Sequence, residues 1–136
     1  MSDCIFCKIV RKEIPAEIVY ENDHVVVFVD IKPINPGHLL VVPKAHSADL
    51  ASASDEAVVA MTMAAREMGK AVMRAFEAPA FNIGVNNGRA AGQLVDHLHA
   101  HVIPRFEGDG HVHWHGGAYA EGEIAKVGQK LRQVLI

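Results

Sequence analysis

The chain has 136 residues, of which 50% are hydrophobic and 21% are charged. This balance excludes a disordered chain and fits a single domain over residues 1–136. The longest apolar runs fall far short of the about 20 residues that a membrane-spanning helix needs, and no secretory signal is visible, so we expect a cytoplasmic location and no membrane partner. The formal net charge of −3 excludes a protein that coats nucleic acid through non-specific attraction to phosphates.

The first third of the chain predicts a short helix and three strands. Residues Cys4–Val10 place apolar side chains at helical spacing, with both cysteines on one side. The β-branched and aromatic runs Ile18–Tyr20 and Val25–Val29 predict two antiparallel strands, because a polar link of hairpin length joins them. After a break rich in proline, the run Leu39–Pro43 predicts a third strand that stops at its proline.

The rest of the chain predicts a long helix, two strands and a final helix. Ser54 is a suitable N-cap for the long helix, whose apolar stripe packs into the core and comprises Val58, Met61, Ala65, Met68, Val72 and Phe76. Strands are expected at Phe81–Val85 and Val95–Ile103, on either side of a turn rich in glycine and asparagine. The final helix is expected from about Glu121, with an apolar face of Ile124, Val127, Leu131 and Leu135.

This order of elements favours an α+β fold with an antiparallel sheet of about five strands. Short turns or one long helix join successive strands, and the regular alternation of strand and helix that marks a doubly wound fold is missing. The sequence also has no glycine-rich phosphate loop. A bound phosphate group would therefore need other donors.

Six of the nine histidines form two alternating clusters. In an extended strand His97, His99 and His101 would share one face at spacings of about 6.6 Å. The residues that point into the core would then be Leu98, Ala100 and Val102. Three imidazoles on one surface suit either a metal site or the attack on a phosphoryl group, and the spacing alone leaves both open.

The second cluster has the same alternation in a different setting. His111, His113 and His115 lie between glycines and have no apolar frame of strand length, which predicts an exposed segment. Contact with substrate or metal is the alternative, because short histidine-rich tracts do bind metals.

The stretch Ala91–Arg105 contains histidine and apolar residues in the order His, apolar, His, apolar, His, apolar, apolar, and it resembles the signature of the histidine-triad (HIT) superfamily. Further matching blocks follow in family order: Ile5–Val10, Lys12–Pro15, Asp30–Ile31, Pro36–His38, Val42–Lys44 and Asn86. The resemblance covers most of residues 4–106 and is close to the nucleotide-binding branch. It implies a HIT-like fold and a homodimer that pairs through the long helix and the neighbouring sheet edge.

The resemblance also implies a reaction at the α-phosphorus of a purine nucleoside phosphoramidate. His99 would be the nucleophile, His101 would contact the phosphate oxygens, and His97 and His38 would orient the triad. The implied nucleotide contacts are Asp30 at the ribose, then Phe6, Phe28 and Ile31 around the base. The phosphate would lie against Asn86 and the turn residues Gly92, Gln93, Leu94 and Val95. Leu94 departs from the small hydroxyl residue that is common in the family, which puts the preferred leaving group in doubt.

The pair Cys4 and Cys7 is open to three interpretations: a metal pair, a redox pair or plain thiols. The resemblance implies a structural zinc site formed by Cys4, Cys7, His46 and His97, since related proteins pair such cysteines with these histidines. Three functional alternatives also stay open. They are a dinucleoside polyphosphate hydrolase of the same superfamily, a nucleotide-binding regulatory protein with vestigial activity, and a metal-carrying protein.

Overall fold

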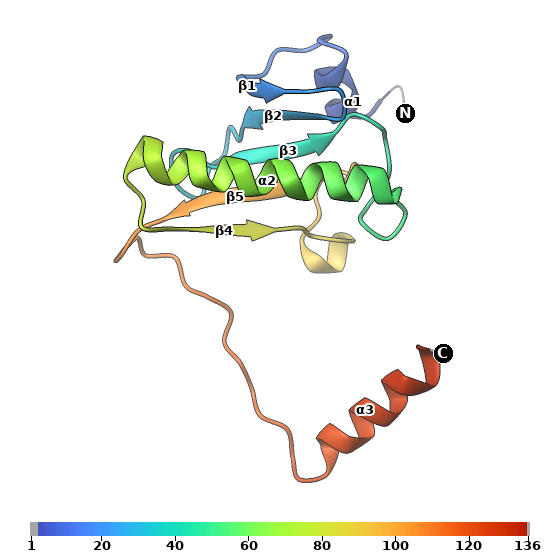
Figure 1. Ribbon diagram of the computed structural model, residues 1–136. Coiled ribbons are helices and arrows are strands. Elements are labelled where there is room, and N and C mark those ends of the chain that lie inside the picture. The colour runs from blue at the N-terminus through green and yellow to red at the C-terminus, as the bar shows by residue number, and fades with distance from the viewer. Residues whose placement is uncertain (1–2, 136) are drawn as a thin grey trace.

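The computed structural model describes residues 3–135, which form an antiparallel five-stranded sheet with three α-helices (Figure 1). The elements in chain order are α1 (Ile5–Val10), β1 (Ile18–Glu21), β2 (Val25–Val29), β3 (Leu39–Pro43), α2 (Asp55–Phe76), β4 (Ala80–Gly84), a 3-10 turn η1 (Arg89–Ala91), β5 (Ala100–Arg105) and α3 (Glu123–Val134). The strand order in the sheet is β1-β2-β3-β5-β4. The predicted α+β class with about five antiparallel strands is confirmed.

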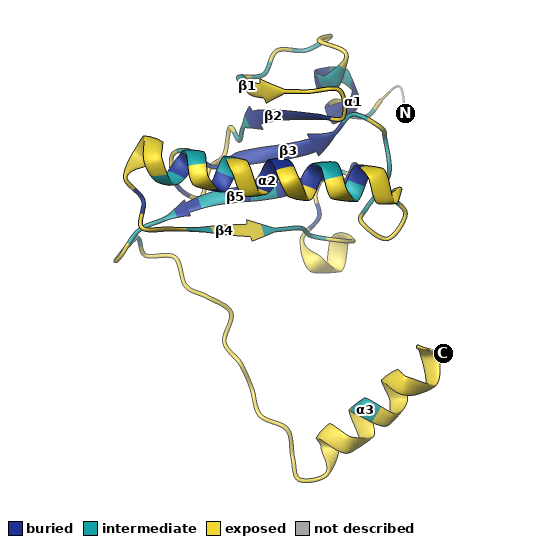
Figure 2. Ribbon diagram, in the orientation of Figure 1, coloured by how far each residue is buried: buried dark blue, intermediate teal, exposed yellow. Residues whose placement is uncertain are grey.

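The central strands β2 and β3 are buried on both faces, which explains their unbroken apolar sequences. Helix α2 lies across one face of the sheet (Figure 1) and covers a core that includes Val25, Val27, Leu39 and Val41. The opposite face holds a second core in which α1 packs, formed by Phe6, Ile9, Val26, Phe28, Leu40 and Val42. Figure 2 shows this burial along both strands.

Helix α2 begins and packs largely as the sequence predicts. The Ser54 hydroxyl accepts a hydrogen bond from the backbone amide of Ala57 at 3.1 Å, which caps the first turn. Gly69 allows the helix to approach the sheet, because a Cβ there would lie 2.2 Å from a ring atom of Phe81. The predicted stripe is wrong at its end, since Phe76 is 46% exposed in the last turn.

The fifth strand is shorter and later than predicted. The alternation predicts a strand over 95–103, whereas β5 covers Ala100–Arg105 and includes Pro104. Ahead of it the chain leaves the ladder, because the amide of Leu98 donates to the carbonyl of Ser47 at 2.8 Å instead of to a neighbouring strand. The fourth strand is displaced in the opposite direction. It begins one residue before the predicted position, at Ala80, and ends at Gly84.

Helix α3 stands away from the sheet at the end of an extended segment (Figure 1). It begins at Glu123, and its apolar side chains are exposed, with Ile124 at 68% and Leu131 at 53% (Figure 2). None of the helices described in residues 3–135 is both long and apolar enough to cross a membrane. That residues 1–136 form a single domain stays a prediction.

Candidate active site

His101 is held on the face of the sheet opposite α2. It pairs with Leu40 of β3 and with Gly84 of β4. Cross-strand partners share a face of the sheet, and Leu40 belongs to the core away from α2. Ala100 and Val102 lie in the core beneath α2, as does Leu98, which confirms that the residues between the histidines point into the core.

The other two histidines of the triad precede the strand. His97 and His99 lie in the irregular segment before β5, so the predicted geometry of three rings along one strand face is wrong for them. Contacts to distant parts of the chain set their positions instead. The rings of His99 and His101 nevertheless lie together, with centroids 5.0 Å apart.

The environment of His99 determines which of its ring nitrogens is free. Its side chain is 7% exposed, and Nδ1 lies 2.7 Å from the backbone carbonyl oxygen of His97. A carbonyl only accepts hydrogen bonds, so Nδ1 carries the proton and Nε2 of the neutral ring carries the lone pair. Within residues 3–135 the structure gives Nε2 no hydrogen-bond partner. The ring is thus in the tautomer that a nucleophile needs at Nε2.

A chain of three groups sets the opposite tautomer at His101. The backbone amide of Ile34 donates to Nδ1 of His38 at 3.0 Å, so neutral His38 carries its proton on Nε2. That nitrogen lies 2.9 Å from Nδ1 of His101, which therefore accepts. Neutral His101 then holds its own proton on Nε2, where it is available to a phosphate oxygen.

Burial keeps these two rings neutral near pH 7. Burial, with a smaller contribution from the neighbouring His99 and His38, lowers the pKa of His101 to about 4 against the opposing effect of Asp30. Burial also lowers the pKa of His38, while the nearby carboxylate of Asp30 acts in the opposite direction. The Oδ2 atom of Asp30 lies 3.5 Å from Nε2 of His38. The site therefore offers neutral imidazoles in defined tautomers.

A second cluster of donors lies where α1 meets the segment before β5. Nδ1 of His97 lies 3.4 Å from Sγ of Cys4, 3.6 Å from Sγ of Cys7 and 3.2 Å from Nδ1 of His46. Nε2 of His97 lies 2.8 Å from the carbonyl oxygen of Pro43 and donates to it, which leaves the Nδ1 lone pair facing the cluster. Burial raises the pKa of the Cys7 thiol and lowers the pKa of His97.

These four side chains fit a tetrahedral zinc ion. Zinc bonds of about 2.3 Å to sulfur and 2.0–2.1 Å to nitrogen give edges of roughly 3.3–3.8 Å in a regular tetrahedron. The donor separations of 3.2–3.6 Å match those edges, and the four ligand atoms lie within 4.8 Å of one another. Two thiolates and two imidazoles form a closed set without an open position, which is typical of structural sites.

Asp30, His38 and His101 also bring three ligand atoms within 4.8 Å of one another. This group is less suited to a metal, because the amide of Ile34 occupies Nδ1 of His38 as a donor and so requires the proton on Nε2. A protonated nitrogen has no lone pair for a metal. The group is better described as a hydrogen-bonded relay that ends at His101.

The residues expected around the nucleoside divide into buried and exposed ones. Phe6 and Phe28 are buried and meet edge to face with ring centroids 5.5 Å apart. Asp30 follows β2, and its Oδ1 accepts a hydrogen bond from the amide of Lys32 at 2.8 Å. Ile31 is 91% exposed beside it. The apolar side chain of Phe28 and the carboxylate of Asp30 therefore lie at the same end of β2.

The side chain of Gln93 makes its hydrogen bonds to the backbone of its own turn and of the segment before α2. Its Oε1 accepts from the amide of Gly88 at 2.7 Å, and its Nε2 donates to the carbonyls of Ala48 and Val95 at 2.7 and 2.9 Å. The side chain is 3% exposed, so its acceptor and both its donors are used inside the protein. These contacts do not fit the expected phosphate role and make Gln93 a brace between the turn and the segment before α2.

The other turn residues differ in their environments. Gly92 has a φ of +95°, which favours glycine, and a Cβ there would lie 3.7 Å from the side-chain nitrogen of Asn86. Leu94 is 83% exposed, and Val95 packs against the core that contains Phe6. Asn86 lines the same cleft as His38 and His101.

Comparison with known proteins is decisive about the family. The HIT domain family matches residues 11–108. The chain belongs to the HIT family.

Relatives of this HIT protein carry informative names. It is 41% identical over 108 residues to the protein named adenylylsulfatase HINT3 from Arabidopsis thaliana, covering 79% of this chain and 55% of that one. A histidine triad nucleotide-binding protein from Candida albicans aligns with a TM-score of 0.85 and 34% identity, over 98% of this chain and 97% of the other. A zinc-bound histidine triad family protein from Mycobacterium smegmatis aligns with a TM-score of 0.78 and 34% identity, over 98% and 96%. Together the family and these relatives support a nucleotide-binding hydrolase.

A cleft of about 750 Å³ adjoins the histidine cluster of this HIT protein. His38 and His101 line one side of it, and His111, Val112 and Trp114 line another. His99 is not among its lining residues, but its ring lies next to that of His101. The second histidine tract is exposed, as the sequence predicts.

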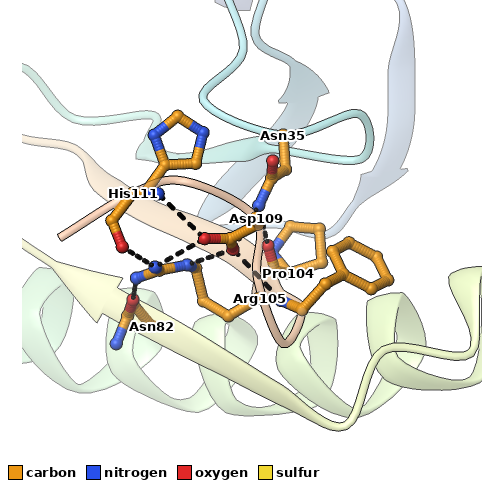
Figure 3. A network of polar contacts seen from close by, with 7 residues as sticks. Asn35, Asn82, Pro104, Arg105, Asp109 and His111 are labelled. Atoms are coloured by element: carbon orange, nitrogen blue, oxygen red, sulfur yellow. Dashed lines mark hydrogen bonds and ion pairs between the residues drawn. The ribbon is translucent and has the colours of Figure 1, made fainter.

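Sequence reasoning missed the polar network that anchors the segment after β5 (Figure 3). Asp109 accepts from Nε of Arg105 at 2.8 Å and from the side chain of Asn35 at 3.0 Å. Arg105 also donates to the carbonyl of His111 at 2.9 Å and to the side chain of Asn82 at 2.7 Å. The Arg105 guanidinium lowers the pKa of Asp109 well below its usual range. The i, i+4 pair of opposite charges was the available signal, but its partners Asn35 and Asn82 are remote in sequence.

Proposed function

We propose that this HIT-family hydrolase cleaves purine nucleoside phosphoramidates, such as adenosine 5'-phosphoramidates, through a covalent nucleotidyl group on His99. The observation that carries the proposal is the hydrogen bond of 2.7 Å between Nδ1 of His99 and the His97 carbonyl. It leaves the Nε2 lone pair free while the proton stays on the other nitrogen. A nucleophile in this state needs no base to remove a proton before it attacks.

The reaction then has two displacements. Nε2 of His99 attacks the α-phosphorus, the phosphorus–nitrogen bond breaks, and the departing nitrogen takes a proton from solvent and leaves as an amine. Water next attacks the same phosphorus, the bond to Nε2 breaks, and a nucleoside monophosphate leaves as water gives up a proton. The Nε2–H of His101 donates to a phosphate oxygen in both steps, held there by the relay from Ile34 through His38.

Two surrounding features support a nucleotide as the substrate. The carboxylate of Asp30 lies beside His38 and is suited to ribose hydroxyls. The apolar wall of Phe6 and Phe28 lies on the same face of the sheet. The exposed side chain of Leu94 leaves only its backbone to meet a leaving group, so we assign no preference among amines.

The decisive test is the mass of the protein after a rapid quench with adenosine 5'-phosphoramidate. An added adenosine monophosphate mapped to His99 supports the proposal, and turnover without an adduct in the His99→Gly protein contradicts it. Parallel reactions with a diadenosine polyphosphate and with adenosine 5'-phosphosulfate distinguish the dinucleoside polyphosphate alternative and the activity named for the Arabidopsis relative. Tight nucleotide binding without turnover of any of the three would favour the vestigial regulatory alternative.

We also propose that the protein is a homodimer. Strand β4 is an edge strand, and the neighbouring helix α2 exposes Val59 at 60% and Met63 at 49%. Exposed apolar side chains next to an unpaired strand edge favour pairing with a second copy. Light scattering after size-exclusion chromatography is expected to give twice the mass of the chain, and a monomer would contradict the proposal.

A further inference from the structure

Helix α1 contributes residues both to the four-ligand cluster and to the surroundings of His99. Cys4 is its N-cap, with Sγ accepting from the amide of Cys7 at 3.4 Å, and Cys7 lies in its first turn. Phe6 stands between these two cysteines in sequence. Its ring meets the ring of His99 edge to face, with centroids 5.1 Å apart and an interplanar angle of 88°. One residue of the cluster's own helix thus packs against the nucleophile.

A second connection runs through His97. The ring of His97 is 0% exposed, with Nε2 bonded to the Pro43 carbonyl and Nδ1 facing the two thiols. The backbone carbonyl of the same residue accepts the bond from His99 Nδ1. Both ends of the His97 ring are therefore held. This restraint and the bond from the Leu98 amide to Ser47, in the same peptide unit, together set the position of the His97 carbonyl.

We propose that Phe6 and His97 are positioning residues that transmit the geometry of the Cys4, Cys7, His46 and His97 cluster to the ring of His99. Ligation of the cluster by zinc fixes the carbonyl that sets the His99 tautomer and the aromatic edge that sets the orientation of its ring. The kinetic part of this inference rests on the proposed function, but the structural part does not.

The argument depends on how the three segments of the cluster are joined. Cys4 and Cys7 come from α1, His46 from the loop after β3, and His97 from the segment before β5. Among the described residues 3–135, the side-chain hydrogen bonds that join α1 to the other two segments are those inside the cluster. When the cluster is not ligated, α1 loses its side-chain restraint against the other two segments, and the His97 ring is held only at Nε2. The bond between the Leu98 amide and the Ser47 carbonyl still joins those two segments, so the effect on the His97 carbonyl is a loosening.

The inference gives Phe6 a role different from the base contact that the sequence predicts. Phe6 is 6% exposed, and its ring is flanked by Phe28, His97 and His99. A wall of the base pocket acts on substrate binding, whereas a positioning residue acts on the chemical step. The two roles therefore separate in kinetics.

The first experiment uses Cys4→Ser and measures His99 without substrate. Serine can keep the N-cap of α1 but is a poor zinc ligand, so the helix is retained while zinc affinity falls by about 100-fold. Long-range proton–nitrogen NMR of the zinc-loaded wild type is expected to show His99 as a single Nδ1–H tautomer. In Cys4→Ser, and in the wild type after chelation, the two tautomers are expected to be mixed, and zinc restores the single form only in the wild type. Lys8→Ala, on the same helix and outside the cluster, is the matched control and should give the wild-type spectrum.

Two results would overturn the inference. One is a zinc-loaded wild type whose His99 spectrum does not change on chelation, and the other is a wild type that takes up no zinc. Because no substrate is used, these results are separate from a failure of the proposed function, which would appear as the absence of turnover and adduct in the wild type.

The second experiment separates positioning from base contact. Phe6→Leu keeps an apolar side chain in the core but removes the aromatic edge. As a positioning residue, Phe6 is expected to give a kcat lower by about 10-fold to 100-fold with little change in KM, because small displacements of a reacting group are costly. The Phe6→Leu protein is also expected to show a changed His99 ring spectrum with zinc bound. A raised KM with unchanged kcat and an unchanged spectrum would return Phe6 to the base pocket and overturn its part in the inference.

Discussion

The two histidine tracts of this protein have the same alternation and opposite environments. His97 and His99 are buried, His101 is partly buried, and each ring has at least one nitrogen assigned by a close partner. In the second tract all residues from 111 to 115 are exposed. Across residues 3–135, none of the ring nitrogens of that tract has a hydrogen-bond partner. Alternation therefore indicates where histidines lie, but only packing gives a ring nitrogen a role.

The difference comes from the residues between the histidines. Leu98 and Ala100 are each 1% exposed in the core beneath α2, which anchors the first tract to the sheet. In the second tract Val112 is 80% exposed and Trp114 is 96% exposed. Apolar side chains that find no core leave the neighbouring imidazoles free to turn toward solvent. The following predictions test this contrast.

The largest expected effect is on turnover. His99→Gly is expected to lower kcat by about 10⁴-fold or more, because it removes the attacking nitrogen while the nucleoside contacts remain. Nucleotide binding by calorimetry should persist. His115→Gly, the same change in the second tract and outside the cleft, is expected to leave turnover unchanged. Comparable losses in both proteins would remove the functional distinction between the tracts.

The next effect is on metal content. His46→Ala removes one of four zinc ligands and is expected to weaken zinc binding by about 100-fold or more, since even a partner outside the ligand set costs up to that amount. Replacement of all three histidines of the second tract by alanine should leave the zinc content of purified protein near one equivalent. Elemental analysis of both proteins, purified without added zinc, measures this. Zinc loss only in the triple variant would assign the metal to the other tract.

A smaller effect concerns stability and pH. The pKa of His101 is about 4 in the folded protein and near its ordinary value of 6.5 in the unfolded chain, and the pKa of His38 is also lowered on folding. Between these values the unfolded chain binds more protons than the folded protein, so the free energy of unfolding falls as the pH drops from about 6.5 to about 4. Denaturant titrations at several pH values should show this slope, and His101→Gln should reduce it. A slope that is identical in both proteins would contradict the lowered pKa of His101 as the cause of the pH dependence.

The smallest effect concerns the segment that joins β5 to the second histidine tract. The carboxylate of Asp109 accepts from the backbone amides of Phe106 and His111 at 3.1 and 3.0 Å. Asp109→Asn keeps the size of the side chain but weakens its pairing with Arg105, so exchange of these two amides with solvent should accelerate by about 10-fold. Glu107→Gln is the matched control in the same segment. Hydrogen exchange followed by NMR measures both, and equal rates in wild type and Asp109→Asn would remove the network as an anchor.

Much of the fold was predictable because local pattern and burial agree. The runs at Val25–Val29 and Leu39–Pro43 become β2 and β3 with the predicted bounds. The strand predicted over 95–103 failed at its start. There the alternation of His97 and His99 is real, but the Leu98 amide bonds to Ser47 and the Gln93 side chain holds the turn. Both partners lie about fifty residues away, where a local pattern gives no information.

The candidate site shows the same division. The resemblance to the family implies Cys4, Cys7, His46 and His97 as a ligand set, and the structure brings all four together. Exposure was not predictable: Phe6 and Gln93 are buried, while Ile31 and Leu94 face solvent. An apolar residue in a motif can lie either in the core or on the protein surface, and the packing around it decides which.

The sequence by itself determined the order of the elements, the HIT signature and the set of histidines, because these follow from local composition and spacing. Only the tertiary structure decided which nitrogen of each ring holds a proton. His97 is set by the carbonyl of Pro43, His99 by that of His97, and His101 by His38 under the amide of Ile34. A neutral imidazole has one donor and one acceptor, so its chemistry depends on the partner at its other nitrogen, and folding supplies that partner.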